Sequence, residues 1–484
     1  MLIYVLLIVL LLLSLTCAVV ESSHFDFLPT LVTSFNSSDG DRSFDWDARC
    51  FHENTMTFKF QDKDKKLVVS LETSYARSPV CMDTYLVLTQ SGLHLREVFF
   101  RGRHRWHIRL SDQDFIDAKK NGVFIFNVDQ SFIHNAKDVF HTLHMFMGKH
   151  SARENVDFLQ ERLNITLQPR HIPPTAFDVN LLRPGDVILE SDGGSAITTI
   201  ISFGTGAFAG HCGIILDIDG VLHFVESTYQ AHGKEFKPRR GFSATPFERW
   251  LKEESTIKYE MAILMPLSDD ISKRFNNSAA VEWFKRNEGT PYGMSNFIYT
   301  FIDTEHDNWP GSFTWQMILV ATKIAEAVVP DYIDTIMFAG LRHRLNDYSV
   351  KSVEDIVKVL IKRGDMNFGQ LLAIPEDKDW MYDGNRQLVC SSFVFELLKQ
   401  GGIFHPDLID FIVPQEQTPK DLAQLAIYRE NWPDKPAYCG YGTSSICQVF
   451  GNFHYPEIEY FNKIDPYVNM NLFCPLQRTP DMKC

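Results

Sequence analysis

The sequence predicts an α+β protein built from more than one domain. Its first third contains runs in which apolar and polar residues alternate, which is the pattern of half-buried β-strands. Beyond about residue 180, short strand-like runs are interspersed with segments whose apolar residues recur at helical spacing. The chain has 484 residues, of which 45% are hydrophobic and 22% are charged, so it is long enough for two or three globular domains.

The chain begins with an apolar run, residues 2–15, followed by the small residues Thr16-Cys17-Ala18 and then by polar sequence. This order is typical of a secretory signal peptide, which we predict over residues 1–20. The run lacks the usual basic residues before it, so retention as a membrane anchor is the alternative. No later stretch reaches the ~18 apolar residues that a membrane-spanning helix needs. We therefore predict a protein that is secreted or resides in the endolysosomal lumen, with no stable membrane span after signal removal.

Glycosylation sequons and cysteines agree with export. Sequons begin at Asn36, Asn164 and Asn276. Without the cysteine of the signal peptide, eight cysteines remain, and an even number is expected of a disulfide-bonded protein. Cys50 and Cys81 bracket a short β-like stretch and are predicted to pair. The last four can form two disulfides in any of three pairings: Cys439, Cys447, Cys474 and Cys484. Their spacing contains no Cys-x-x-Cys pair, which disfavours a zinc site.

Residues 40–165 are predicted to form an antiparallel β-sandwich. The strands are expected where alternation and β-branched residues coincide, at 66–73, 84–89, 93–100, 104–110 and 122–128. Nothing in this region points to catalysis. We expect it either to bind a ligand or to pack on the next domain. A linker is predicted by composition at 167–174.

A second domain is predicted over residues 178–430. A turn feeds a strand at 182–190, a loop rich in small residues follows, and a second strand runs from Gly210 to Leu216. Asp217 to Gly220 predicts a hairpin turn, which leads into a return strand over 221–227. Helices are expected at 278–287, 313–329, 352–363 and 389–400. The aromatic-rich stretch 296–386 is predicted to be an insert, and residues 431–484 a disulfide-bearing C-terminal extension.

The strongest chemical signal is a cysteine at the start of the last of these helices. Cys390 precedes apolar residues at helical spacing, so it falls at or just before the first turn. Free N–H groups and the positive end of the helix dipole favour a thiolate there. Ser391 and Ser392 are predicted to cap the helix rather than to act as nucleophiles.

A reactive thiolate also needs a base, and His211 on the strand 210–216 is the leading candidate. Its neighbour Cys212 should point to the other side of that strand, as a small buried residue. We predict that Cys212 and Cys390 are free thiols, because each lies in a motif-like segment of its own. A disulfide between them is the alternative.

Taken in order, these signals resemble the circularly permuted papain-like group, which contains YiiX-type relatives of NlpC-type peptidases and of lecithin retinol acyltransferase. The resemblance rests on Pro184-Gly185-Asp186-Val187, Gly210-His211-Cys212-Gly213, Val225-Glu226-Ser227, Pro291-Tyr292-Gly293 and Val389-Cys390-Ser391-Ser392. It covers about residues 180–300 and 380–405. The long insert and the cysteine-bearing tail depart from the compact pattern of that group, which suggests a eukaryotic secreted branch of it.

The resemblance implies that Cys390 is the nucleophile and His211 the general acid and base. The residue that orients His211 is either Glu226, which matches the Val-Glu-Ser ending of the return strand, or His223. Residues 223 and 226 differ by an odd number, so both cannot face His211 from one regular strand. A carboxylate stabilises an imidazolium better than a neutral ring does, and this favours Glu226.

The sequence thus predicts a cysteine hydrolase that cleaves a peptide-like amide through an acyl-enzyme, without cofactor or metal. Hydrolysis of lipid esters or acyl transfer is the second possibility, and a binding protein without catalysis is the third. A net charge of −14 argues against nucleic acid as the main partner. The insert 296–386 is expected to shape the pocket for a peptide-like or acyl substrate.

Overall fold

The computed structural model describes most of residues 29–464. Within that span it leaves out 77–81, 129–151, 230–240, most of 303–329, 375–385 and several shorter gaps. The predicted signal peptide with Cys17, three of the other eight cysteines (Cys81, Cys474 and Cys484) and most of the predicted helix 313–329 lie outside the described residues. No helix in the described part of the chain is long and apolar enough to cross a membrane.

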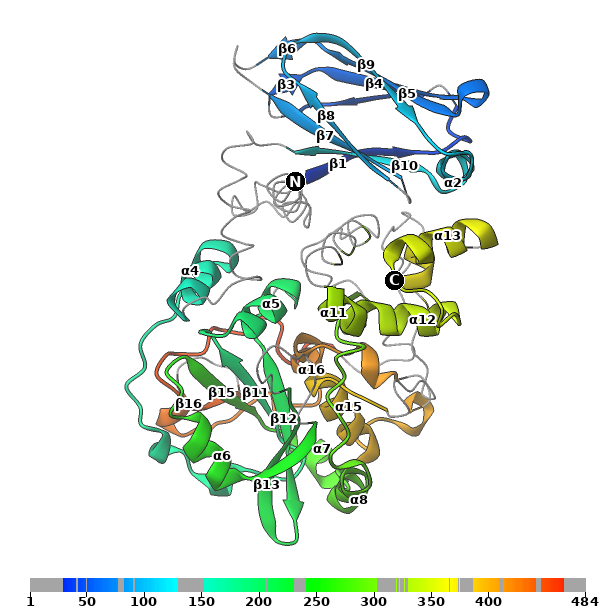
Figure 1. The fold of residues 1–484 in the computed structure, drawn as a ribbon. Helices are drawn as coiled ribbons and strands as arrows, with labels where there is room; N and C mark the ends of the chain where they lie inside the picture. Colours follow the sequence, from blue (N-terminus) through cyan, green and yellow to red (C-terminus); the bar gives the residue numbers. More distant parts are fainter. Residues whose placement is uncertain are drawn as a thin grey trace.

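The N-terminal part consists of two four-stranded antiparallel sheets that enclose one apolar cluster (Figure 1). Phe35 of the first strand stacks on Phe58 of the facing sheet, with 3.7 Å between ring centroids. This strand begins at Pro29, before the predicted boundary at residue 40. The sheets contain, in spatial order, β1 Pro29–Phe35, β10 Val123–Val128, β7 Asp83–Leu88 and β8 Leu93–Val98, and β2 Ser43–Trp46, β4 Asn54–Gln61, β5 Lys66–Thr73 and β9 Gly102–Arg109.

The sheet that contains β7 is buried on both faces. All six residues of β7 are buried. Tyr85 and Val87 face the interior between the two sheets, whereas Leu86 and Leu88 belong to the large apolar cluster that also contains the helices of the second half. Helix α2 (Asp112–Asn121) adds a polar contact, because Lys120 donates a hydrogen bond to the carbonyl oxygen of Gly364. The sandwich thus packs on the rest of the chain.

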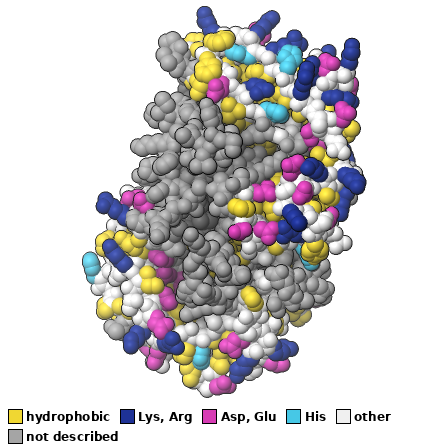
Figure 2. Space-filling model, viewed as in Figure 1, with side chains coloured by type: hydrophobic (Ala, Val, Ile, Leu, Met, Phe, Trp, Pro, Cys, Tyr) yellow, Lys and Arg dark blue, Asp and Glu magenta, His cyan; other side chains and the backbone are white. Residues whose placement is uncertain are grey.

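The outer face of the other sheet is basic. Alternate residues of β9 point outward, and Arg103, Arg105 and Arg109 are exposed there. Figure 2 shows Lys and Arg side chains gathered at the sandwich end of the face drawn, while acidic side chains are spread over the middle and the opposite end. On the face drawn, basic side chains are thus densest at the sandwich end, although some are also present elsewhere.

The second half is organised around a six-stranded antiparallel sheet with the order β14-β13-β12-β11-β15-β16. A two-residue turn of Asp219 and Gly220 joins β12 to β13, and both residues have the positive φ that such hairpins require. The strands are β11 Val187–Asp192, β12 His211–Ile218, β13 Val221–Ser227, β14 Phe242–Pro246, β15 Glu260–Met265 and β16 Cys447–Gly451.

The last strand of this sheet comes from the region predicted to be a C-terminal extension. Strand β16 pairs antiparallel with β15, and a disulfide joins its first residue, Cys447, to Cys439. This is one of the pairings that the sequence left open. Cys50 is also disulfide-bonded.

Helices cover both faces of the sheet (Figure 1). On one face, alternate residues of β12, among them Cys212 and Ile214, join the apolar cluster that contains helix α15 (Cys390–Gln400) and helix α8 (Asn277–Asn287). On the other face, Ile215 joins the cluster around helix α6 (Phe247–Glu254). The alternation of the strand thus places Cys212 on the α15 side.

One predicted loop is a helix. Helix α5 (Ala196–Thr205) occupies much of the glycine-rich stretch between β11 and β12. Its glycines suggested a loop, but the packing of Ile201 into the main core outweighs this local preference. The predicted helix 352–363 is present as α13 (Val353–Arg363), whose N-terminal cap is Ser352. The remaining elements are β3 Phe51–His52, β6 Tyr75–Ala76, α4 Ala152–Leu163, α7 Asp269–Arg274, α9 Tyr299–Ile302, α11 Pro330–Ile333, α12 Ala339–Leu345, α14 Phe368–Leu372 and α16 Pro419–Gln424.

Candidate active site

Cys390 is the first residue of α15, and it is buried with 3% of its surface exposed. The preceding residue, Val389, is extended, and no side chain caps the helix. The hydroxyl groups of Ser391 and Ser392 are buried without a hydrogen-bond partner, so the prediction that they cap the helix was wrong. Instead, the backbone N–H of Ser391 donates to the sulfur of Cys390. The free amide of the first turn thus acts directly on the cysteine, as its position predicts.

The structure brings together Cys390, His211 and Glu226. His211 is the first residue of β12, and its Nε2 lies 2.7 Å from Oε2 of Glu226 on β13. Because Nε2 is engaged by the carboxylate, Nδ1 is the ring nitrogen that remains for the sulfur of Cys390, with which the imidazole forms a hydrogen bond. The side chain of His211 remains 22% exposed, whereas that of Glu226 is 13% exposed.

His223, the alternative partner, lies elsewhere. It pairs with Leu216 across the hairpin, whereas Glu226 pairs with Gly213, closer to His211. The Nδ1 atom of His223 is 2.9 Å from the carbonyl oxygen of Val221. Its odd separation from Glu226 turns it to the opposite side of the strand. The geometry therefore selects Glu226 as the partner of the His211 ring.

The three groups shift one another toward an ion pair. A hydrogen bond from Cys212, together with the interactions of the sulfur with His211 and the Ser391 amide, lowers the pKa of Cys390 well below its usual value despite burial. Burial alone would lower the pKa of His211, but its interactions with Cys390 and Glu226 outweigh burial and raise that pKa well above its usual value. Both shifts favour a thiolate beside an imidazolium.

Tyr292 completes the surroundings of the sulfur, and the sequence assigned it no role. Its hydroxyl contacts both the sulfur and the backbone N–H of Cys390. Tyr292 is buried, and burial together with the charge of Cys390 raises the pKa of its phenol, so the group stays a neutral O–H. A bridge between Tyr292 and Leu388, parallel in sense, holds it beside the start of α15. In the sequence, Tyr292 counted only as part of the Pro291-Tyr292-Gly293 motif that contributes to the resemblance, without a chemical role of its own.

Gly293 allows the close approach of this segment to the start of α15. A Cβ on Gly293 would lie 2.7 Å from the carbonyl carbon of Leu388 and 2.8 Å from the nitrogen of Val389, both of which are backbone atoms. We expect Gly293→Ala to displace the segment before Cys390, to destabilise the fold by about 1–3 kcal/mol and to slow alkylation of Cys390. Thermal unfolding and the rate of alkylation by iodoacetamide measure the two effects.

Gly289→Ala is the matched control for this prediction. A Cβ at Gly289 meets no atom within 4 Å, so this variant carries only the cost of its positive φ of 81°. It should lower the melting temperature without changing the alkylation rate. Equal slowing of alkylation in both variants would contradict the role given to Gly293.

A second carboxylate lies beside His211 and was also missed. Glu190 pairs with His211 across the β11–β12 ladder, and its Oε2 is 4.0 Å from Nε2 of His211. Burial, together with repulsion by Glu226 and Glu254, raises the pKa of Glu190 to about 8 despite the attraction of His211. Glu190 is thus a neutral acid at pH 7, next to the ionised pair. Its signal in the sequence is a glutamate at the end of an otherwise apolar strand.

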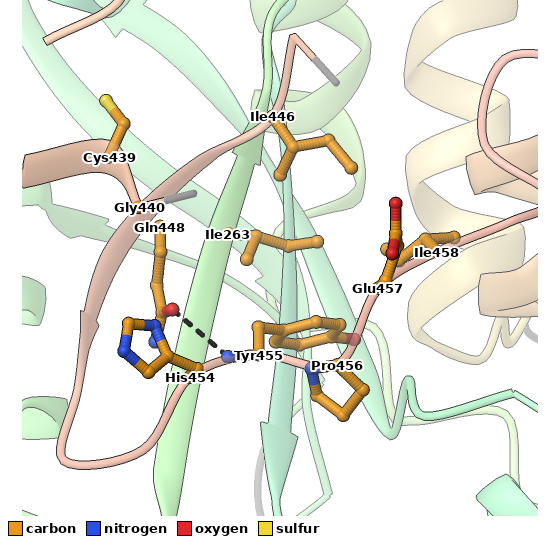
Figure 3. Close-up of a pocket in the computed structure, with 10 residues that line it drawn as sticks. All are labelled: Ile263, Cys439, Gly440, Ile446, Gln448, His454, Tyr455, Pro456, Glu457 and Ile458. Carbon is orange, nitrogen blue, oxygen red and sulfur yellow. Dashed lines mark hydrogen bonds between the residues drawn. The ribbon is translucent and has the colours of Figure 1, made fainter. Parts of the chain in front are cut away.

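A small pocket of about 70 Å³ lies over β15 and β16, on the segment that follows the disulfide (Figure 3). The backbone N–H of Tyr455 donates to Oε1 of Gln448 across it, at 3.1 Å. A pocket of this size has room for several water molecules, and none of the residues that line it belongs to the group around Cys390. Among the described residues, no group of three or more His, Cys, Asp or Glu is arranged to hold a metal ion.

Comparison with known proteins adds a distant likeness to a solved structure. The chain matches no protein-family model and no curated protein. Among solved structures it is similar to the metalloprotein YiiX from Escherichia coli O157:H7, with 15% sequence identity and a TM-score of 0.17. The similarity covers 35% of this chain and 86% of that chain. A TM-score this low carries no argument about the fold or function of this chain.

Proposed function

We propose that this protein is a cysteine hydrolase that cleaves a peptide-like amide bond through an acyl-enzyme on Cys390. The observation that carries the proposal is the contact of the Cys390 sulfur with an imidazole whose far nitrogen is held 2.7 Å from the carboxylate of Glu226. A thiolate, a proton donor beside it and a carboxylate that fixes the tautomer are the parts that nucleophilic catalysis by cysteine needs.

Each group has a defined task in this mechanism. The thiolate of Cys390 attacks the carbonyl carbon, and the carbonyl oxygen becomes an oxyanion. The Tyr292 hydroxyl and the backbone N–H of Cys390, which contact each other beside the sulfur, are the proposed donors to it. His211 then gives its Nδ1 proton to the leaving amine. In the second half-reaction His211 takes a proton from water, which attacks the thioester and releases the acid.

The proposed enzyme is exported and has a permuted papain-like domain. The signal peptide predicted over residues 1–20 and the disulfide between Cys439 and Cys447 fit a secreted or endolysosomal enzyme. The six-stranded sheet with α15 on one face fits a permuted papain-like domain, in which the histidine strand precedes the nucleophile helix. Esters are the second substrate class, because the same acyl-enzyme forms from an ester with an easier leaving group.

The test is the reactivity of Cys390 as a function of pH. In the full-length protein, a thiolate–imidazolium pair should be alkylated by iodoacetamide rapidly even at about pH 6, where an ordinary thiol of pKa ~8.5 is almost unreactive. Cys390→Ala should abolish this rapid labelling, and peptide mapping should place the label on Cys390 in the wild type. Competition with peptide amides and with acyl esters then separates the two substrate classes. Labelling that persists in Cys390→Ala, or that rises only above about pH 8, would refute the assignment.

A further inference from the structure

The described part of the chain contains a second free thiol at the site, and the mechanism above does not consume it. Cys212 and Cys390 are the free cysteines of that part of the chain. Cys212 is fully buried on the α15 side of β12, with Ile214 and Leu216 following on the same face. Its side chain forms a hydrogen bond with the sulfur of Cys390. Two sulfur atoms are thus in contact at the site, although the proposed hydrolysis uses only the sulfur of Cys390.

The two thiols differ in their chemistry. The Cys390 sulfur is held as a thiolate, as described above. Burial and then the charge of Cys390 raise the pKa of Cys212 well above its usual value, so Cys212 remains a neutral thiol. A low-pKa thiol with a second thiol in contact is the arrangement of peroxide-sensitive cysteines, in which the first is oxidised and the second resolves the product.

Packing alone does not require a cysteine at position 212. Apart from Cys390, the residues of its cluster on this face, Ile214 and Leu216 among them, are apolar and need no sulfur beside them. A sulfur here has a consequence that a methyl group lacks, because it is in direct contact with the atom proposed to carry the acyl group. The entrance is narrow, since 3% of Cys390 is exposed. The oxidant must therefore be small.

We propose that Cys212 and Cys390 form a reversible disulfide when a small peroxide reaches the site, and that this bond switches off the nucleophile and protects it. The Cys390 thiolate attacks one oxygen of hydrogen peroxide, which breaks the O–O bond, gives a sulfenic acid and releases hydroxide. The sulfur of Cys212 then attacks the sulfur of the sulfenic acid, the S–O bond breaks, and the proton of Cys212 leaves with the hydroxyl group as water. A dithiol reductant restores both thiols.

The experiment uses the full-length protein. A mild reductant keeps its free thiols reduced during purification and is then removed. Hydrogen peroxide is then added as the oxidant. Free thiols are blocked with iodoacetamide, and peptides are mapped by mass spectrometry. In the wild type, we expect a Cys212–Cys390 cross-linked peptide lighter by two hydrogen atoms, a loss of at least about tenfold in Cys390 alkylation, and recovery with dithiothreitol. In Cys212→Ser, whose hydroxyl can still donate a hydrogen bond to the Cys390 sulfur, dimedone should trap a sulfenic acid on Cys390, and excess peroxide should make the loss of alkylation irreversible. Cys212→Ala should give the same products more slowly, because it removes a hydrogen bond that lowers the pKa of Cys390.

Two outcomes overturn the proposal. The first is dimedone trapping on wild-type Cys390 to the same extent as in the Cys212 variants, without the cross-link. The second is equal recovery of wild type and variants after excess peroxide. The inference rests on the reactive Cys390 of the proposed function, but its test measures the mass of the cross-linked peptide and not hydrolase activity. A cross-link in a protein without hydrolase activity would therefore contradict the proposed function but support the disulfide between Cys212 and Cys390. Hydrolase activity without a cross-link would support the proposed function and contradict the disulfide.

Discussion

Glu226→Gln is expected to lower kcat/KM for hydrolysis by about 10²- to 10⁴-fold, while the melting temperature stays nearly unchanged. The carboxylate accepts the Nε2 proton of His211 at 2.7 Å, and this leaves Nδ1 to serve Cys390. An amide in the same place can donate to Nε2 instead and hold the imidazole in the wrong tautomer. The loss of negative charge also lowers the pKa of His211, which weakens the ion pair with the thiolate. Steady-state kinetics and the pH profile of iodoacetamide labelling measure both effects.

His223→Gln is the matched control for Glu226→Gln. Both residues are on β13, but His223 is turned away from His211 and contacts the carbonyl oxygen of Val221. Its replacement should change kcat/KM by no more than about twofold, because surface substitutions away from a site have small effects. A large loss in His223→Gln together with an active Glu226→Gln would reverse the assignment of the third residue. A shift of the labelling profile to higher pH in Glu226→Gln alone would identify the carboxylate as the group that sustains the ion pair.

The pairing of His211 with Glu226 was within reach of the sequence because a short hairpin fixes it. Asp219 and Gly220 define a two-residue turn, and that turn sets the register of the two strands that it joins. Once the register is known, the residues on each face of the hairpin follow from the alternation along each strand, and this places His211 and Glu226 on the same face. Cys390 was equally accessible, since the apolar pattern after it marks the start of a helix and a helix start favours a thiolate.

The residues that the sequence missed are the ones placed by long-range packing. The alternation of β12 predicts that Cys212 points away from His211, but nothing local says that the start of α15 lies over that strand at the same level. Tyr292 reaches Cys390 through a bridge to Leu388, a contact between segments on either side of the insert. Glu190 looks like the polar end of a strand until the register of β11 and β12 places it opposite His211.

The same reasoning explains the missed elements of the fold. Strand β16 is short and lies beyond a predicted domain boundary, and it is defined by its pairing with β15 rather than by its own composition. Helix α5 is flanked by glycines, and its apolar residues favour a helix only once the large apolar cluster that contains Ile201 has formed. Local patterns thus predicted the pieces of the site that a hairpin or a helix start determines, and not the neighbours supplied by the rest of the chain.

Glu190→Gln is expected to stabilise the protein above about pH 8, by up to a few kcal/mol, and to leave its stability unchanged near pH 4. The pKa of Glu190 is raised to about 8 in the folded state, mainly by burial, against an ordinary value near 4.5 in the unfolded chain. Between these values the folded protein binds a proton that the unfolded chain has lost. The contribution of Glu190 to the free energy of unfolding is therefore fully present below about pH 4.5, falls as the pH rises, and is lost by about pH 8.

Glutamine has nearly the same shape as glutamic acid and cannot ionise. The variant therefore lacks the decrease in the free energy of unfolding that the ionisation of Glu190 causes as the pH rises. The charged groups around Glu190 set the size of the effect. They are His211 on the neighbouring strand β12, Glu226 on β13, Glu254 on α6 and Glu260 on β15, and burial also raises the pKa of Glu260. Chemical denaturation at about pH 5, 7 and 9 should show a gap between variant and wild type that widens with pH. Glu248→Gln, which replaces an exposed glutamate on α6, should show no such widening. A gap that stays constant from pH 5 to 9 would mean that Glu190 is ionised in the fold throughout this range, and the description of a neutral acid beside His211 would be wrong.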